Sequence, residues 1–189
     1  MRIFIAGASG LVGSNCYYHF TAEGMNVLGS YFSFPTNNTV YFNTLDIHDT
    51  ANADLAAFRP DIIVHCGALT HVDYCEDHVE ESYNKTVLST KNLLEIAKQS
   101  GAKLVYISTD YVFDGKHGPY EEEAKTNPLS VYAKHKLEAE QMTLAANKNN
   151  LVLRVTNVYG KEERNKNFVA RILDQCVQKQ TLHLTLPYD

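Results

Sequence analysis

The chain begins with a short apolar segment that leads directly into a glycine-rich turn. Residues 1–6 are rich in β-forming side chains, and Gly7, Gly10 and Gly13 follow before a helix-like segment that ends at Gly24. Glycines let the backbone bend sharply and approach a pyrophosphate closely, and the start of a helix favours its negative charge. The spacing is GxxGxxG rather than GxGxxG. A tight strand-to-helix turn that binds no ligand is therefore an alternative interpretation. Its place after the first strand favours nucleotide binding.

Strand-like and helix-like segments alternate along the rest of the chain. Strands are expected at 1–6, 26–31, 61–65, 103–107, 151–155 and 181–186, and helices at 11–23, 51–58, 80–100, 130–146 and 167–179. The helix at 80–100 carries apolar residues at steps of three and four, and 115–128 is expected to be a loop. Alternating strands and helices predict an α/β fold, a doubly wound Rossmann-type parallel sheet with helices on both faces.

Composition limits the classes of function. The 189 residues suit one domain, or one and a fraction, and the 44% of hydrophobic residues support a sizeable core. The net charge of −5 and the lack of a basic run argue against nucleic acid or an anionic membrane as a partner. No segment is apolar over the ~20 residues that a membrane helix needs, and the N-terminus lacks a signal-peptide layout. Four cysteines without CxxC spacing predict free thiols in the cytoplasm, and the scattered histidines predict no metal site.

Polar residues follow the ends of three predicted strands. These are residues 66–70, 108–110 and 156–157. Ser and Thr at such places are common helix N-caps, so each group by itself is a weak signal. Ligands of doubly wound sheets, however, bind at the carboxyl ends of the strands. We therefore expect these residues to meet the glycine turn along one edge of the sheet.

Tyr132 and Lys136 lie four residues apart at the start of a predicted helix, so their side chains lie on one helical face. A phenol titrates near ~10, and a neighbouring ammonium can lower its pKa by roughly 1–3 units. A tyrosine tuned in this way can serve as a general acid or base. The pair alone is also typical of a surface Tyr beside a solvated Lys. Its place beside the polar strand ends favours the functional interpretation.

Together these stretches resemble the extended short-chain dehydrogenase/reductase family. Within it, the chain looks most similar to the dTDP-4-dehydrorhamnose reductases and their relatives, over essentially its whole length. The resemblance is carried by residues 58–65, by 104–115 with the stretch STDYVFDG, by 127–136 and by 166–169. It implies an enzyme that uses NADP(H) or NAD(H) to reduce the C4 carbonyl of a nucleotide-linked 4-keto-6-deoxysugar, as in dTDP-rhamnose biosynthesis.

The resemblance also implies roles for particular residues. Tyr132 gives a proton to the forming alkoxide, Lys136 lowers the pKa of Tyr132 and binds the nicotinamide ribose, and Thr109 binds the substrate oxygen. The implied catalytic residues are Thr109, Tyr132 and Lys136, and the implied substrate-binding residues are Thr109, Asp110 and Asn157. The implied cofactor-binding residues are Tyr132, Lys136, Gly7, Gly10, Leu11, Val12, Gly13, Ser30, Asp46, Ile47, Ala68, Leu69 and Thr70.

The chain departs from the family pattern at three places. The second predicted strand ends at Ser30 and Tyr31 without the acidic residue that favours NAD, yet no Arg or Lys stands nearby to hold a 2′-phosphate. We therefore expect NADP(H) or the use of both cofactors. Asn157 stands where the rhamnose-forming enzymes usually have Trp, which leaves the sugar open. Family members continue into a smaller lobe, so residues 1–189 are expected to be the NAD(P)-binding domain with part of the substrate site.

Two alternatives to the reductase remain open. One is a non-catalytic, NADP-binding regulatory subunit that resembles the one of methionine adenosyltransferase and would retain the Tyr–Lys pair. The other is a nucleotide-sugar epimerase or dehydratase, which recycles its nicotinamide. Net oxidation of NADPH by a keto-sugar would separate the reductase from both. The resemblance further implies a nucleotide-sugar substrate and a homodimer.

Overall fold

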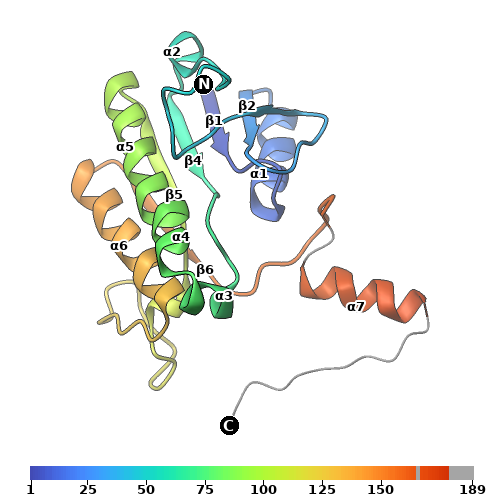
Figure 1. Ribbon diagram of the computed structural model, residues 1–189, viewed down its shortest axis with the longest axis vertical. Helices are drawn as coiled ribbons and strands as arrows, with labels where there is room; N and C mark the ends of the chain where they lie inside the picture. Colours follow the sequence, from blue (N-terminus) through green and yellow to red (C-terminus); the bar gives the residue numbers. More distant parts are fainter. Residues whose placement is uncertain (165–166, 179–189) are drawn as a thin grey trace.

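One sheet of parallel strands organises residues 1–164 and 167–178, the part of the chain that the computed structural model describes (Figure 1). Its strands are β1 (Arg2–Ala6), β2 (Asn26–Tyr31), β3 (Thr39–Tyr41), β4 (Ile62–His65), β5 (Lys103–Thr109) and β6 (Leu151–Val155). Their order is β3-β2-β1-β4-β5-β6, and every neighbouring pair is parallel. The chain order reverses between β1 and β4, where such folds bind ligands. The predicted doubly wound Rossmann-type fold is confirmed.

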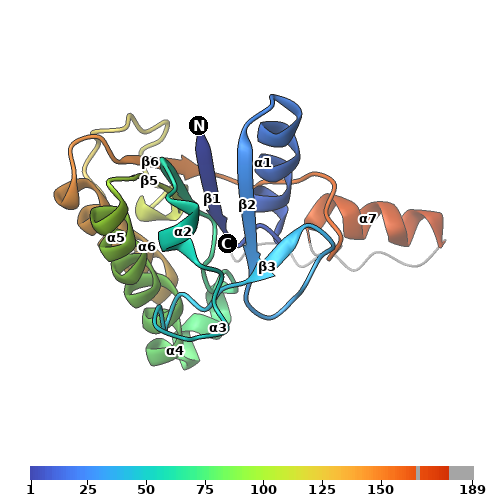
Figure 2. The same cartoon turned by 90° about the horizontal axis from the view of Figure 1, so that it is seen from above.

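Helices cover both faces of the sheet. Helix α1 (Leu11–Ala22) packs on one face beside β1 and β2, and α5 (Ser89–Ser100) and α6 (Val131–Ala146) pack on the other (Figures 1 and 2). Three short helices, α2 (Leu55–Phe58), α3 (Val72–Asp77) and α4 (Val79–Tyr83), lie in the connections. Helix α7 (Phe168–Val177) projects away from the sheet in both views.

The core has one apolar layer on each face because successive strand residues point to opposite sides. Phe4, Ile63 and Leu104 are fully buried under α5 and α6. Ile3 and Ile5 face α1 in the second layer. Burying each of these side chains contributes roughly 1.5–3 kcal/mol. The two layers fix the sheet between its helices and so fix the edge at which the strands end.

The predicted helix at 80–100 is divided into three parts. Helix α4 leads into a π-helical turn at Asn84–Leu88, and α5 follows without a break in the chain direction. The apolar period of the sequence does not mark this turn, because one extra residue per turn changes the spacing only locally. Gly101 ends α5 with φ of +75°, as expected for a glycine after a helix.

Two short elements were not predicted, and one helix is shorter than expected. Strand β3 has only three residues in a polar segment, and α3 follows β4 without an apolar period. Helix α2 begins at Leu55 rather than at residue 51 because Asn52 is held in the preceding loop. Its side chain accepts a hydrogen bond from Asn43 N at 2.6 Å and donates one to Asp46 O at 2.8 Å. The predicted strand at 181–186 and the last residue of the helix at 167–179 lie outside the described residues.

Candidate active site at the carboxyl ends of the strands

The glycine turn between β1 and α1 is packed so closely that two of its glycines cannot be replaced without movement. Gly7 has φ of +85°, and a Cβ there would lie 3.0 Å from Gly67 N. A Cβ on Gly13 would lie 2.3 Å from Gly7 O, far inside van der Waals contact. The backbone of residues 66–67, which follow β4, therefore lies directly against the turn.

The N-terminus of α1 is suited to hold an anion. The first turn of a helix has N–H groups without intrahelical partners. Here the N-cap is Gly10, which offers no side-chain hydrogen bond, and the first turn contains no acidic residue. Leu11 and Val12 occupy the first two helical positions. The turn thus fits the pyrophosphate of a dinucleotide, because donors are available and no carboxylate repels the charge.

The segment after β4 runs along the same edge. Cys66 N donates to Ala6 O at 2.9 Å and so extends the pairing of β4 with β1. Residues 68–69 are half-buried and Thr70 is exposed, while Leu69 O accepts a weak hydrogen bond from Cys75 Sγ at 3.7 Å. Gly67 lies against Gly7 of the glycine turn, and Ala68, Leu69 and Thr70 continue from it towards α3.

Lys136 is buried beneath this edge, with 4% of its surface exposed. Its Nζ donates to the Ile107 carbonyl and lies 4.3 Å from the centroid of the Tyr106 ring. Burial lowers the pKa of Lys136 to about 7, against the opposite influence of Cys66 and Glu140. The side chain is therefore an amine that exchanges its proton near neutral pH.

Tyr132 lies one helical turn before Lys136 and contacts the end of β5. Its phenol lies near the Thr109 side chain, and its ring meets the Tyr111 ring edge-on with centroids 6.2 Å apart. The Thr109 side chain also lies 3.3 Å from Asp110 Oδ1, to which it donates. Thr109, Asp110 and Tyr132 thus lie together at the end of β5, and Lys136 lies one helical turn further along α6.

The predicted effect of Lys136 on the Tyr132 pKa is wrong for this structure. Burial raises the pKa of Tyr132, and the nearby Thr109 side chain opposes that rise. Lys136 does not lower it because its Nζ is directed to the Ile107 carbonyl rather than to the phenol. Tyr132 is therefore protonated at neutral pH, which is the form that can donate a proton.

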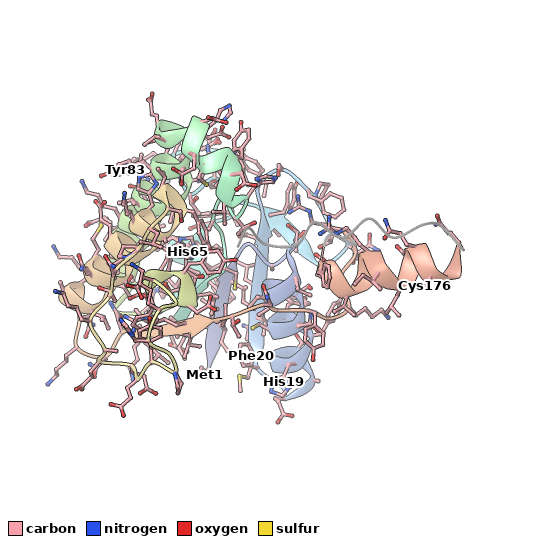
Figure 3. All side chains as sticks on the ribbon, turned by 90° about the horizontal axis from the view of Figure 1, so that it is seen from below. Met1, His19, Phe20, His65, Tyr83 and Cys176 are labelled. Carbon is pink, nitrogen blue, oxygen red and sulfur yellow. The ribbon has the colours of Figure 1, made fainter. Side chains whose placement is uncertain are left out.

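His65 is a residue of this region that the sequence did not single out. It ends β4, is fully buried, and lies in the interior between the sheet and the helices (Figure 3). Its Nε2 is 3.4 Å from Ser89 Oγ, which donates to Thr44 Oγ1 at 2.9 Å. Its Nδ1 has no partner among the described residues. Burial, followed by the charge of Lys136, lowers the pKa of His65 to about 3.

Four predicted residues lie further from this cluster or make other contacts. The Ser30 hydroxyl is buried and donates to Ile5 O at 3.3 Å, so its side chain does not reach the surface at the end of β2. Asp46 is exposed and accepts from His48 N at 3.1 Å, and Ile47 beside it is half-buried. Asn157 is exposed just beyond β6.

An open pocket of about 460 Å³ lies beside the start of α6. The residues that line it are Val72, Asp110, Tyr111, Phe113, Asp114, Gly115, Tyr120, Leu129 and Ser130. Phe113 and Tyr120 stack with their centroids 4.4 Å apart, and Asp114 accepts from Tyr120 Oη at 2.6 Å and from Asn127 Nδ2 at 3.0 Å. These hydrogen bonds hold the pKa of Asp114 far below its usual range. The loop of residues 113–129 is thus held in place by these contacts and forms a largely apolar wall of the pocket near Tyr132.

A family model described as the RmlD substrate binding domain matches residues 1–186. The chain belongs to this family. It is 34% identical over 163 residues to the dTDP-4-dehydrorhamnose reductase of Mycobacterium tuberculosis (strain CDC 1551 / Oshkosh), covering 84% of this chain and 50% of that protein. It is 38% identical over 177 residues to methionine adenosyltransferase 2 subunit beta of Xenopus tropicalis, covering 94% and 53%. The chain spans about half the length of these curated relatives.

A solved structure of a reductase extends the comparison. The dTDP-4-dehydrorhamnose reductase of Bacillus anthracis, crystallised in complex with NADP, superposes on this RmlD-family chain with a TM-score of 0.80 at 28% identity. The match covers 94% of this chain and 60% of that one. The extended short-chain dehydrogenase/reductase assignment made from the sequence is therefore confirmed. Within residues 1–164 and 167–178, no helix is both long and apolar enough to cross a membrane, and all four cysteines are free thiols.

Proposed function

We propose that this chain is the cofactor-binding part of an NAD(P)H-dependent reductase that acts on the C4 carbonyl of a nucleotide-linked 4-keto-6-deoxysugar. The observation that carries the proposal is that Tyr132 lies near Thr109 at the end of β5, one helical turn before the buried Lys136, in a sheet whose β1 leads into a glycine turn without a side-chain cap. The similarity to dTDP-4-dehydrorhamnose reductases supports this substrate class. The proposal includes a place in dTDP-rhamnose biosynthesis, in the cytoplasm, with a homodimer as the assembly.

In this proposal each residue has a chemical task. When bound, the reduced nicotinamide supplies a hydride, and the backbone of the glycine turn holds the pyrophosphate. The Tyr132 hydroxyl, protonated because burial raises its pKa, gives a proton to the oxygen of the reduced carbonyl. Thr109, which lies near the Tyr132 phenol, holds the same oxygen. Lys136, buried one helical turn after Tyr132, binds the nicotinamide ribose.

The test is NADPH oxidation, followed by its absorbance, with a dTDP-4-keto-6-deoxysugar as substrate. We expect Tyr132→Phe to lower turnover by about 10²–10⁴-fold, because general acid catalysis is lost, while NADPH affinity stays the same. Tyr18→Phe is the matched control, since Tyr18 is an exposed phenol on α1 outside this cluster. Full activity of Tyr132→Phe would refute the assignment. The assay is run side by side on this chain and on the gene-length protein.

A non-catalytic regulatory subunit is the second candidate, because of the 38% identity to methionine adenosyltransferase 2 subunit beta. That class would bind NADPH without oxidising it and would form a stable complex with a methionine adenosyltransferase. The Tyr–Lys pair does not separate the two candidates. Tight NADPH binding without oxidation, together with altered kinetics of an added methionine adenosyltransferase, would support the regulator against the reductase.

A further inference from the structure

A cation from a distant segment lies beside the loop that follows β2. The guanidinium carbon of Arg164 is 5.4 Å from the centroid of the Phe34 ring, three residues beyond the end of β2 at Tyr31. Arginine stacks favourably on aromatic faces in this way and keeps its planar donors available. The sequence places no Arg or Lys in the residues just after β2, so only the fold brings this charge there.

The segment that carries Arg164 crosses the start of α1. Asn15 Nδ2 donates to Lys161 O at 3.0 Å and to Leu11 O at 2.8 Å. A Cβ on Gly160 would lie 3.6 Å from Leu11 Cδ1, an ordinary packing contact. Figure 2 shows the chain after β6 running past α1 towards the side of the sheet that holds β2 and β3. The segment after β6 therefore passes the start of α1 and places Arg164 beside Phe34, beyond the end of β2.

The same segment is held in shape by its own hydrogen bonds. Asn167 N donates to Glu162 Oε1 at 2.7 Å, and Asn167 Nδ2 donates to Gly160 O at 2.9 Å. Asn167 is 9% exposed and also accepts from Ala170 N at 3.0 Å, which caps α7. Within the described part of the chain, Arg164 forms no ion pair with a carboxylate. Its guanidinium is thus positioned but not neutralised.

The end of β2 also lacks the charge that would repel a phosphate. No acidic residue occurs between Gly24 and Leu45, and the Ser30 hydroxyl is turned inward to Ile5 O. A dinucleotide whose pyrophosphate lies on the glycine turn places its adenosine ribose over the end of β2. An acid there would bind the 2′-hydroxyl of NAD, whereas a guanidinium suits the 2′-phosphate of NADP.

We propose that Arg164, stacked on Phe34, binds the 2′-phosphate of NADP(H) and is the residue that makes this chain prefer NADP(H) over NAD(H). This inference rests on the proposed nucleotide-binding function of the glycine turn. It does not depend on whether the chain is a reductase or a regulator, because both would use the same adenosine end of the cofactor.

The test is binding, measured by calorimetry, of four ligands: NADPH, NADH, 2′,5′-ADP and 5′-AMP. We expect Arg164→Gln to weaken NADPH and 2′,5′-ADP by about 10–100-fold, as for the loss of a charged hydrogen-bond partner, and to leave NADH and 5′-AMP unchanged. Arg171→Gln is the matched control, because Arg171 is an exposed arginine on α7. It should bind all four ligands as the wild type does.

Two results would overturn the inference in different ways. The first is an Arg164→Gln variant that keeps the wild-type ratio of NADPH to NADH affinity, whether the two affinities are unchanged or fall together. In that case Arg164 does not bind the 2′-phosphate. The proposed function would survive that result. If the wild-type chain binds none of the four ligands, the nucleotide-binding function fails and the inference fails with it.

Discussion

Glu140 and Arg154 form a buried ion pair whose loss should be among the most destabilising single changes in the chain. Arg154 Nε lies 3.0 and 3.3 Å from the two carboxylate oxygens, and one terminal nitrogen lies 2.8 Å from Glu140 Oε2. The Glu140 side chain is 1% exposed and that of Arg154 is 23% exposed. The pair joins α6, which carries Tyr132 and Lys136, to β6.

The expected cost of Glu140→Gln follows from these contacts. Removing one partner of a buried pair typically costs about 3–5 kcal/mol. Arg154 still reaches solvent, donates to Glu122 O at 2.8 Å and lies over the Phe113 ring at 5.1 Å, so we expect the lower part of that range or slightly less, about 2–3 kcal/mol. With a urea m-value of about 2 kcal/mol/M, in the middle of the typical range, the midpoint of equilibrium urea unfolding should fall by about 1–1.5 M.

Two further variants separate the ion pair from a general effect of substitution in α6. Glu138→Gln changes an exposed glutamate on the same helix and should leave the midpoint within about 0.3 M of the wild type. Replacing the pair by apolar residues, Glu140→Leu with Arg154→Met, should recover most of the stability, because no buried charge is then left unpaired. A Glu140→Gln midpoint equal to that of Glu138→Gln would refute the reasoning.

Two other predictions concern the site itself. The pKa of Lys136 is about 7 when folded and near ~10.4 when unfolded, so between these values the unfolded chain binds more protons and stability rises with pH. Between pH 7.5 and 9, the free energy of unfolding of the wild type, measured in urea, should rise by about 1 kcal/mol per pH unit relative to that of Lys136→Met. Parallel pH profiles of the two proteins would contradict this. Gly13→Ala should lower the free energy of unfolding by about 1–3 kcal/mol, despite the better helix propensity of Ala, because its Cβ would lie 2.3 Å from Gly7 O. The same variant should abolish NADPH binding. Gly10→Ala, whose Cβ would lie 3.5 Å from the same oxygen, should keep its thermal midpoint, and equal losses in the two variants would rule out this steric explanation.

Much of the fold and part of the site could be predicted from local sequence pattern. The strand, the glycine turn and the helix that begins at Leu11 are encoded by neighbouring residues, since backbone freedom and apolar period act over a few positions. The same holds for the Ser130 cap that starts α6, where the Ser130 hydroxyl accepts from Ala133 N at 3.2 Å. Tyr132 and Lys136 share a helical face for this reason alone.

What those residues do to one another was decided only by the tertiary structure. The sequence suggested that Lys136 would lower the pKa of Tyr132, but packing against β5 turns the amine to Ile107 O and buries the phenol, which raises its pKa. The sequence likewise offered no cation after β2, and the crossing of α1 by the segment after β6 brings Arg164 to Phe34. Helix and turn are short-range properties, whereas burial, charge and hydrogen-bond partners depend on residues that are far apart in the chain and meet only when it folds.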